Sequence, residues 1–270
     1  MAFECPSEMG YGLFMDSSLS GKWVLITGAS SGFGEAAARA FAAEGCKLLL
    51  GARRVDRLEK IAAAIRQPGA GHALDVASTA SVEKFVEWAR AKTARVDVLI
   101  NNAGGAQGLD PVASGRDEDW ETMLQTNVLG LLRVTRAVLP LLVNHAGGSI
   151  LNIGSIAGHT AYEGGAVYCA AKAGERKITQ SLRLELSGTG IRVGSLDPGL
   201  AETEFSKVRF KGDEAKAKKV YEGIHALTAE DIAETLVWMA SRPAHVNIDE
   251  MVIKPTDQAA IHKVFRRTKQ

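Results

Sequence analysis

The stretch that decides the fold is Lys22-Trp-Val-Leu-Ile-Thr27-Gly28-Ala-Ser-Ser-Gly32-Phe-Gly34, followed by the alanine-rich residues 35–44. The apolar run predicts a strand, the glycines a tight turn, and the alanine-rich residues a helix. Such a turn leaves backbone N–H groups of the helix start unpaired, and glycine lets a pyrophosphate approach without a Cβ in the way. The stretch therefore predicts an anion site, with an ordinary strand–helix turn as the alternative.

The same alternation continues along the chain. Short apolar runs predict further strands, at residues 46–50, 71–74, 96–100, 149–153, 190–196 and, as an edge strand, 251–253. Helical stretches lie between them, at residues 55–66, 78–93, 117–142 and 228–241 and around Tyr168. This order predicts an α/β fold: a single-domain, doubly wound parallel sheet (Rossmann-like) with helices on both faces. Ligands of such sheets bind beyond the carboxyl ends of the strands.

The end of the second predicted strand carries arginines where an acid is expected for NAD. An acid about 20 residues after the glycines would hold the ribose 2′-hydroxyl. Here the strand ends in Gly51-Ala-Arg53-Arg54. A guanidinium pairs with a 2′-phosphate, which favours NADP over NAD, although the two arginines also suit the exposed start of a helix. Asp75, at the end of the third strand, is predicted to accept from the adenine amino group.

Composition excludes several classes of protein. The 270 residues carry a formal net charge of +1, with 46% hydrophobic and 23% charged residues. No excess charge favours nucleic acid or a membrane surface. The scattered cysteines (Cys5, Cys46 and Cys169) and six histidines show no ligand spacing, so we expect no disulfide framework, no metal and a cytoplasmic location. Residues 1–20 are predicted to be a flexible N-terminal extension of a domain spanning 21–270, and residues 1–14 could precede a natural start at Met15.

Tyr168 and Lys172 lie four residues apart in a predicted helix, so both side chains share one face. A nearby ammonium favours the phenolate form of a tyrosine, which makes the pair a candidate proton donor and acceptor. The pair alone is also compatible with a surface helix that carries a half-buried tyrosine and a solvated lysine. The rest of the chain favours the first interpretation.

Together the motifs resemble the short-chain dehydrogenase/reductase family from Lys22 to about Ile253. They are Thr27-Gly-Ala-Ser-Ser-Gly-Phe-Gly34, Asp75-Val76, Asn101-Asn-Ala-Gly104, Asn127, Ser155, Tyr168-x-x-x-Lys172 and Pro198-Gly199-x-x-x-Thr203. The resemblance implies a catalytic tetrad. Tyr168 would exchange the substrate proton, Lys172 would assist it and hold the nicotinamide ribose, Ser155 would bind the substrate oxygen, and Asn127 would support a water.

The resemblance also implies a set of NADP contacts. They are Gly28, Ser30, Ser31, Gly32, Phe33, Gly34, Arg53, Arg54, Asp75, Val76, Asn102, Ala103, Gly104, Tyr168, Lys172, Pro198, Gly199 and Thr203. The nicotinamide would supply the hydride chemistry, and the protein would supply position and charge.

A narrower resemblance is to the bacterial NADP-dependent 3-hydroxy acid dehydrogenases. It rests on Gly51-Ala-Arg-Arg54 with Arg57-Leu58, Tyr162-x-Gly-Gly-x-Val-Tyr168, Thr203-Glu-Phe-Ser-Lys-Val-Arg-Phe-Lys-Gly212 and Arg242-Pro-Ala-His-Val-Asn247. That group acts on serine, L-allo-threonine, 3-hydroxyisobutyrate or 3-hydroxypropionate and reduces malonic semialdehyde. The implied partner is a small, carboxylate-bearing substrate bound under a mobile lid at residues 200–223. The lid cations Lys207, Arg209 and Lys211 are candidate carboxylate ligands, or a solvated helix surface.

Two other functions remain open at this point. One is a short-chain reductase of ketoacyl, sugar or xenobiotic carbonyls, since the lid sets the substrate. The other is a non-catalytic NADP-binding regulator, which the intact tetrad disfavours. The resemblance further implies a homotetramer whose long fourth and fifth helices pack between subunits.

Overall fold

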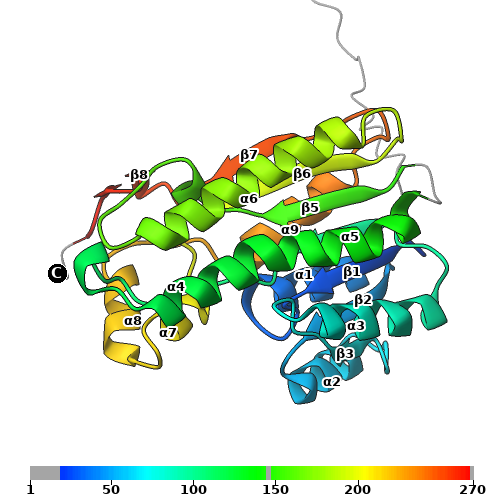
Figure 1. Cartoon of the computed structure of the whole chain (residues 1–270), viewed down its shortest axis with the longest axis horizontal. Helices are drawn as coiled ribbons and strands as arrows, with labels where there is room; N and C mark the ends of the chain where they lie inside the picture. The colour runs from blue at the N-terminus through cyan, green and yellow to red at the C-terminus, as the bar shows by residue number, and fades with distance from the viewer. Residues whose placement is uncertain (1–18, 144–146, 268–270) are drawn as a thin grey trace, which may run out of the picture.

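The computed structural model describes residues 19–143 and 147–267, and within them the predicted strands form one parallel sheet (Figure 1). Its order is β3-β2-β1-β4-β5-β6-β7, and every neighbouring pair is parallel. The bounds are β1 Trp23–Thr27, β2 Lys47–Ala52, β3 Gly71–Ala73, β4 Val98–Asn101, β5 Ser149–Ile153, β6 Arg192–Pro198 and β7 Glu250–Ile253. Residues 1–18 of the predicted extension lie outside the described residues, while Leu19 is buried and its carbonyl contacts the Cys46 thiol.

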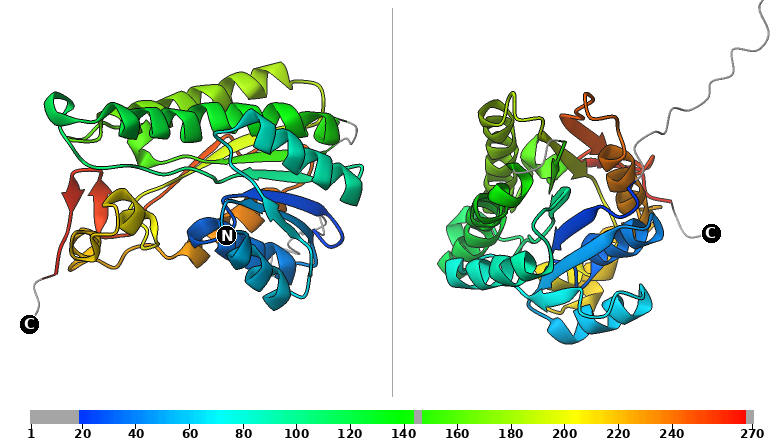
Figure 2. Two further views of the ribbon diagram at one scale, coloured as in Figure 1. Left: turned by 60° about the horizontal axis from the view of Figure 1, so that its bottom comes forward. Right: turned by 90° about the vertical axis from the view of Figure 1, so that its right-hand side faces the viewer.

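Helices cover both faces of the sheet (Figure 2). Helices α1 (Gly32–Ala43), α2 (Val55–Ala64) and α9 (Ala229–Ala240) pack on one face. Helices α3 (Thr79–Lys92), α5 (Gly130–Val143) and α6 (Ala166–Glu185) pack on the other. Strands covered on both faces need apolar side chains in both directions, and adjacent Leu25 and Ile26 are both fully buried. The doubly wound prediction is confirmed.

The strand order places the ligand-binding edge. The chain runs outward from β1 through β2 to β3 and then returns to β4 on the other side of β1. The order therefore reverses between β1 and β4, and a crevice forms beyond their carboxyl ends. The glycine turn after β1 and the Asn101–Gly104 turn after β4 meet at this point.

The predicted continuous helix at residues 117–142 was wrong in one respect. The structure has α4 (Asp117–Met123), a π-helical turn (Leu124–Leu129) and then α5. The side-chain amide of Asn127 donates to the Met123 carbonyl at 2.8 Å, the carbonyl that the Asn127 N–H would take in an α-helix. We attribute the wider turn to this competition.

The remaining elements lie beyond the carboxyl edge of the sheet. The charged segment after β6 forms α7 (Phe205–Arg209) and α8 (Glu214–Tyr221). A hairpin of β8 (Gln258–Ala260) and β9 (Lys263–Val264), absent from the sequence prediction, follows β7. Short 3₁₀ turns occupy Val112–Ser114 and Ile156–Gly158.

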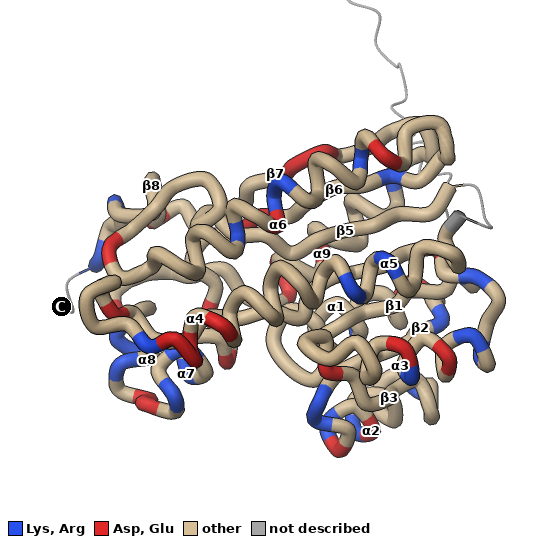
Figure 3. The backbone as a smooth tube through the Cα atoms, viewed as in Figure 1, with Lys and Arg blue, Asp and Glu red and all other residues tan. Residues whose placement is uncertain are grey.

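Charged residues of both signs are interspersed over α2, α3 and α8 (Figure 3), as the near-zero net charge requires. Among the described residues, no helix combines the length and the apolar character needed to cross a membrane.

Candidate active site

A cavity of about 420 Å³ lies at the carboxyl edge of the sheet, where the strand order reverses. Fifteen of the predicted cofactor residues line it: Gly28, Ser30, Ser31, Gly32, Phe33, Arg53, Arg54, Asp75, Val76, Asn102, Ala103, Gly104, Tyr168, Lys172 and Thr203. They come from the ends of β1, β2, β3 and β4, from α6 and from the segment before α7. The volume of the cavity and its mixed polar and apolar lining suit a dinucleotide.

The glycine turn is shaped by close approach of the backbone. Gly28 has φ of +67°, a conformation that favours glycine. A Cβ on Gly34 would press on the Gly28 carbonyl and lie 2.6 Å from the Asn102 amide nitrogen. That amide donates to the Thr27 and Gly28 carbonyls at 2.9 and 3.2 Å. Gly34 and the Asn102 side chain therefore hold the turn in shape from behind, while its front faces the cavity.

The two arginines predicted to meet a 2′-phosphate differ in their contacts. Arg53 is exposed and lines the cavity. Arg54 donates to the hydroxyls of Ser30 and Ser31 at 3.1 and 2.6 Å, and to Glu204 at 3.0 Å. Arg54 thus stands beside the glycine turn, Arg53 lines the same cavity, and their donors suit a phosphate.

Glu204 is a member of this cluster that the sequence analysis missed. Its carboxylate accepts from both Arg54 and Arg57. Partial burial acts to raise the pKa of Glu204, but the two guanidinium groups outweigh it and hold the pKa below its ordinary value. Because Glu204 immediately precedes α7, these contacts tie the predicted lid segment to the arginines that follow β2.

A second cavity, of about 300 Å³, adjoins the first at Tyr168, Gly154, Phe33, Thr203 and Phe205, which line both. Predicted residues Ser155, Pro198 and Gly199 line this second cavity and not the first. The rest of its wall is largely apolar, including Leu109, Ile156, Phe210, Val220 and Ile261. The two cavities form a dinucleotide-sized space and a smaller space that meet at the tyrosine.

Helix α6 brings Tyr168 and Lys172 to that meeting point, and both are nearly buried, at 8% and 7% exposed. The Lys172 ammonium donates to the Ile153 carbonyl and to the Glu175 carboxylate, each at 2.7 Å. Burial acts to lower the pKa of Lys172, but Glu175 and Tyr168 more than offset it and raise the pKa. Lys172 is therefore a charged group at neutral pH, and the solvated-lysine alternative was wrong.

Ser155 and Asn127 occupy different surroundings. The Ser155 hydroxyl caps the 3₁₀ turn by accepting from the Ala157 N–H at 3.1 Å and lines the second cavity. Asn127 is 2% exposed, lines neither cavity, and bonds both backbone groups of Gly105. Its side chain positions the loop after β4, which lines the first cavity.

Of the three lid cations, Arg209 alone lines the second cavity. Its guanidinium lies 5.4 Å from the Tyr162 ring centre and 5.7 Å from that of Tyr168. Its Nε donates to the Gly108 carbonyl at 2.9 Å, which fixes it over the two rings. The other two cations hold surface carboxylates instead, Lys207 that of Glu214 and Lys211 that of Asp119.

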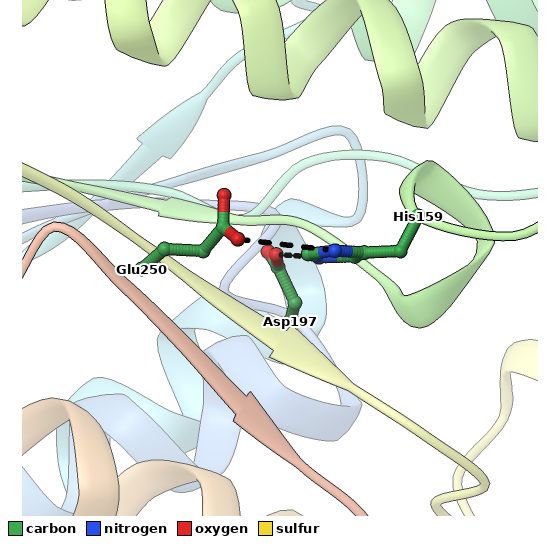
Figure 4. Close-up of side chains that lie close together, drawn as sticks. All are labelled: His159, Asp197 and Glu250. Atoms are coloured by element: carbon green, nitrogen blue, oxygen red, sulfur yellow. Dashed lines mark hydrogen bonds and ion pairs between the residues drawn. The ribbon is translucent and has the colours of Figure 1, made fainter. Parts of the chain in front are cut away.

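Three further ionisable groups, His159, Asp197 and Glu250, lie together at the end of β6 (Figure 4). Their ligand atoms fall within 4.8 Å of one another. His159 bonds Asp197, and Glu250 accepts from Arg176 at 2.6 and 3.0 Å. These ion pairs account for the arrangement, so it gives no evidence of a metal site.

A class of protein is defined by these two joined cavities, the glycine turn and the tyrosine–lysine pair: the nicotinamide-dinucleotide oxidoreductases. Comparison with known proteins identifies the family. Residues 22–214 match the model of the short chain dehydrogenase family. The chain belongs to the short-chain dehydrogenase/reductase family and is an oxidoreductase that acts on hydroxyl and carbonyl groups.

Individual relatives are similar over most of their length. The chain is 47% identical to an NADP-dependent 3-hydroxy acid dehydrogenase from Salmonella typhi, over 87% of this chain and 96% of the relative. It is 45% identical to sulfoacetaldehyde reductase 2 from Chromohalobacter salexigens, over 87% and 95%. The closed form of a serine dehydrogenase complexed with NADP+ superposes with a TM-score of 0.85 at 42% identity, covering 91% of this chain and all of that one.

Proposed function

We propose that this protein transfers a hydride between NADP(H) and a small 3-hydroxy acid or 3-oxo acid, of the serine, L-allo-threonine or 3-hydroxypropionate type. The cofactor assignment to NADP is supported by the NADP-dependent relatives and by Arg53 and Arg54 beside the glycine turn. Bound NADP would supply the hydride chemistry. The residues proposed to hold it are those that line the first cavity, together with Pro198 and Gly199, which line the second.

The proposed tetrad divides the remaining work among four side chains. Tyr168 gives a proton to the carbonyl oxygen in reduction and takes one from the hydroxyl in oxidation. Lys172 favours the deprotonated tyrosine and holds the ribose, and Ser155 donates to the substrate oxygen and stabilises developing negative charge. Asn127 keeps the Gly105 loop in register beside them.

The single observation that carries the substrate class is the position of Arg209. A guanidinium fixed beside the Tyr168 ring, in an otherwise largely apolar cavity, suits a substrate with an anionic group close to the reacting carbon. Tyr162 shares that guanidinium: burial raises the pKa of Tyr162 to about 12, with Arg209 partly opposing this, so the phenol stays neutral. We propose that Arg209 holds the substrate carboxylate and that α7 and α8 form the substrate lid around residues 200–223.

Arg209→Gln tests this assignment, with Lys207→Gln as the matched control from the same helix. Loss of a charge-assisted pair in a cavity is worth roughly 1.5–3 kcal/mol, or about 10- to 100-fold in affinity. We expect KM for L-allo-threonine to rise by that factor in Arg209→Gln and to stay within about twofold in Lys207→Gln. An unchanged KM in Arg209→Gln would remove it as the carboxylate ligand.

A second candidate is a reductase of neutral ketones or aldehydes, which the apolar wall of the second cavity favours. Leu109, Phe210, Val220 and Ile261 offer no partner for a charged group. This candidate predicts turnover of uncharged carbonyls that does not depend on Arg209.

The proposed homotetramer is supported by apolar side chains left exposed along the predicted fourth helix, residues 117–142, one of the two that would pack between subunits. Leu124 and Leu129, in the π-helical turn, are 42% and 38% exposed, and Leu132, on α5, is 40% exposed. Packing of these helices between subunits would bury them. We expect light scattering to give four times the chain mass, and a monomeric mass would contradict the assembly.

A further inference from the structure

Glu175 is a buried acid beside the active site, and the proposed tetrad does not include it. It lies on α6, three residues after Lys172, and is 3% exposed. A charged group is costly to bury unless it is paired. A buried carboxylate at this position therefore requires a partner.

The contacts of Glu175 lead directly to Lys172. Its Oε2 accepts from the Lys172 ammonium at 2.7 Å, and the Ile153 carbonyl accepts at the same distance. A lysine ammonium has three donors. Two are thus engaged by the protein, which fixes the ammonium at the wall of the first cavity.

The charges that act on Glu175 come from two elements. Lys172 on α6 favours the carboxylate, and Asp197 on β6 opposes it. Asp197 is itself bonded to His159, beside Glu250 (Figure 4). Burial raises the pKa of Glu175 to about 7, against the opposing effect of Lys172. Near neutral pH a small change in local charge therefore changes how much of this carboxyl group is ionised.

We propose that Glu175 is a positioning residue of the hydride-transfer site, which fixes the Lys172 ammonium. When the cationic nicotinamide of NADP+ binds, the Glu175 carboxyl group releases a proton to solvent. This role of Glu175 rests on the proposed function, in which Lys172 holds the nicotinamide ribose. The reduced nicotinamide is uncharged, so NADPH lacks this effect. Glu175 thereby favours the oxidised cofactor increasingly as the pH rises through neutrality.

The expected size follows from Coulomb's law. Two unit charges about 10 Å apart at an effective dielectric near 20 shift a titration by roughly one pH unit. At pH 7 the ionised fraction of Glu175 would rise from about one half to about nine tenths, a release of roughly 0.4 proton per NADP+ bound.

The test is titration calorimetry of the cofactor alone, in two buffers of different ionisation enthalpy at pH 7. Protons released by the 2′-phosphate are common to NADP+ and NADPH, so the difference between the two cofactors isolates the nicotinamide charge. We expect wild type to release roughly 0.4 proton more with NADP+ than with NADPH. Glu175→Gln keeps the shape and cannot ionise, so the part of the difference that Glu175 contributes should be lost. Glu185→Gln, an exposed acid on the same helix, should retain it.

An unchanged difference in Glu175→Gln would overturn the role of Glu175. If that variant does not fold, the wild-type difference measured from pH 5 to 9 decides the matter, because it must peak between about pH 6 and 7 and a flat profile contradicts it. No hydroxy acid is present, so failure of the proposed substrate class would leave these results unchanged. Absence of NADP+ binding by wild type would instead overturn both.

Discussion

Replacing Glu175 by Gln should change how the stability of the cofactor-free protein depends on pH. In the folded chain burial holds the pKa of Glu175 at about 7, against an ordinary value of 4.5, despite the opposing effect of Lys172. Between those values the folded state binds a proton that the unfolded state has lost. Stability due to this group is therefore full below pH 4.5 and declines as the pH rises to about 7.

The size of the effect follows from the two pKa values. A difference of about 2.5 between the two pKa values corresponds to roughly 3 kcal/mol, at about 1.4 kcal/mol for each pKa unit. The free energy of unfolding should be measured by urea titration from pH 4.5 to 8 for wild type, Glu175→Gln and the control Glu185→Gln. In wild type Glu175 and Tyr168 outweigh the effect of burial and raise the pKa of Lys172, so Lys172 stays charged throughout this range. Relative to Glu175→Gln, wild type should lose about 3 kcal/mol across the range. A constant difference would refute the reasoning.

Three other substitutions probe the site. Tyr168→Phe should lower turnover roughly 100- to 10,000-fold while the NADP+ dissociation constant, measured by fluorescence quenching, changes little; retained turnover would refute the proton-transfer role. Arg54→Ala should reduce the preference for NADPH over NADH roughly tenfold or more in kcat/KM, because the proposed donor to the 2′-phosphate is lost and Glu204 keeps only Arg57. An unchanged ratio would leave the discrimination to other residues. Gly34→Ala should lower Tm by roughly 3–10 °C in calorimetry, because its Cβ would lie 2.6 Å from the Asn102 amide nitrogen, and a Tm within about 1 °C of wild type would mean that the turn adjusts freely.

The sequence was most informative where local chemistry and the fold agree. Apolar runs such as Leu48–Leu50 are long enough only for strands, and the glycines between residues 28 and 34 allow the positive φ and the close backbone approach that the turn requires. Four-residue spacing placed Tyr168 and Lys172 on one face of α6. The family resemblance then ordered these pieces into one edge of one sheet.

Features that depend on long-range contacts were not predicted from the sequence. The π-helical turn arises where Asn127 reaches the Gly105 loop, 22 residues earlier, and periodicity carries no trace of that. Glu204 meets Arg54 across 150 residues. Glu175 did leave a signal, because an acid three residues after a lysine shares its helix face, but its burial comes only from the packing of α6 against the sheet.

The central claim is tested most directly by following NADP+ reduction with L-allo-threonine, L-serine and 3-hydroxypropionate, beside secondary alcohols of similar size that lack a carboxylate. The proposed function predicts selective oxidation of the hydroxy acids, with a KM that rises in Arg209→Gln. Turnover of the neutral alcohols alone would contradict it, and would leave the apolar wall of the second cavity as the determinant of the substrate.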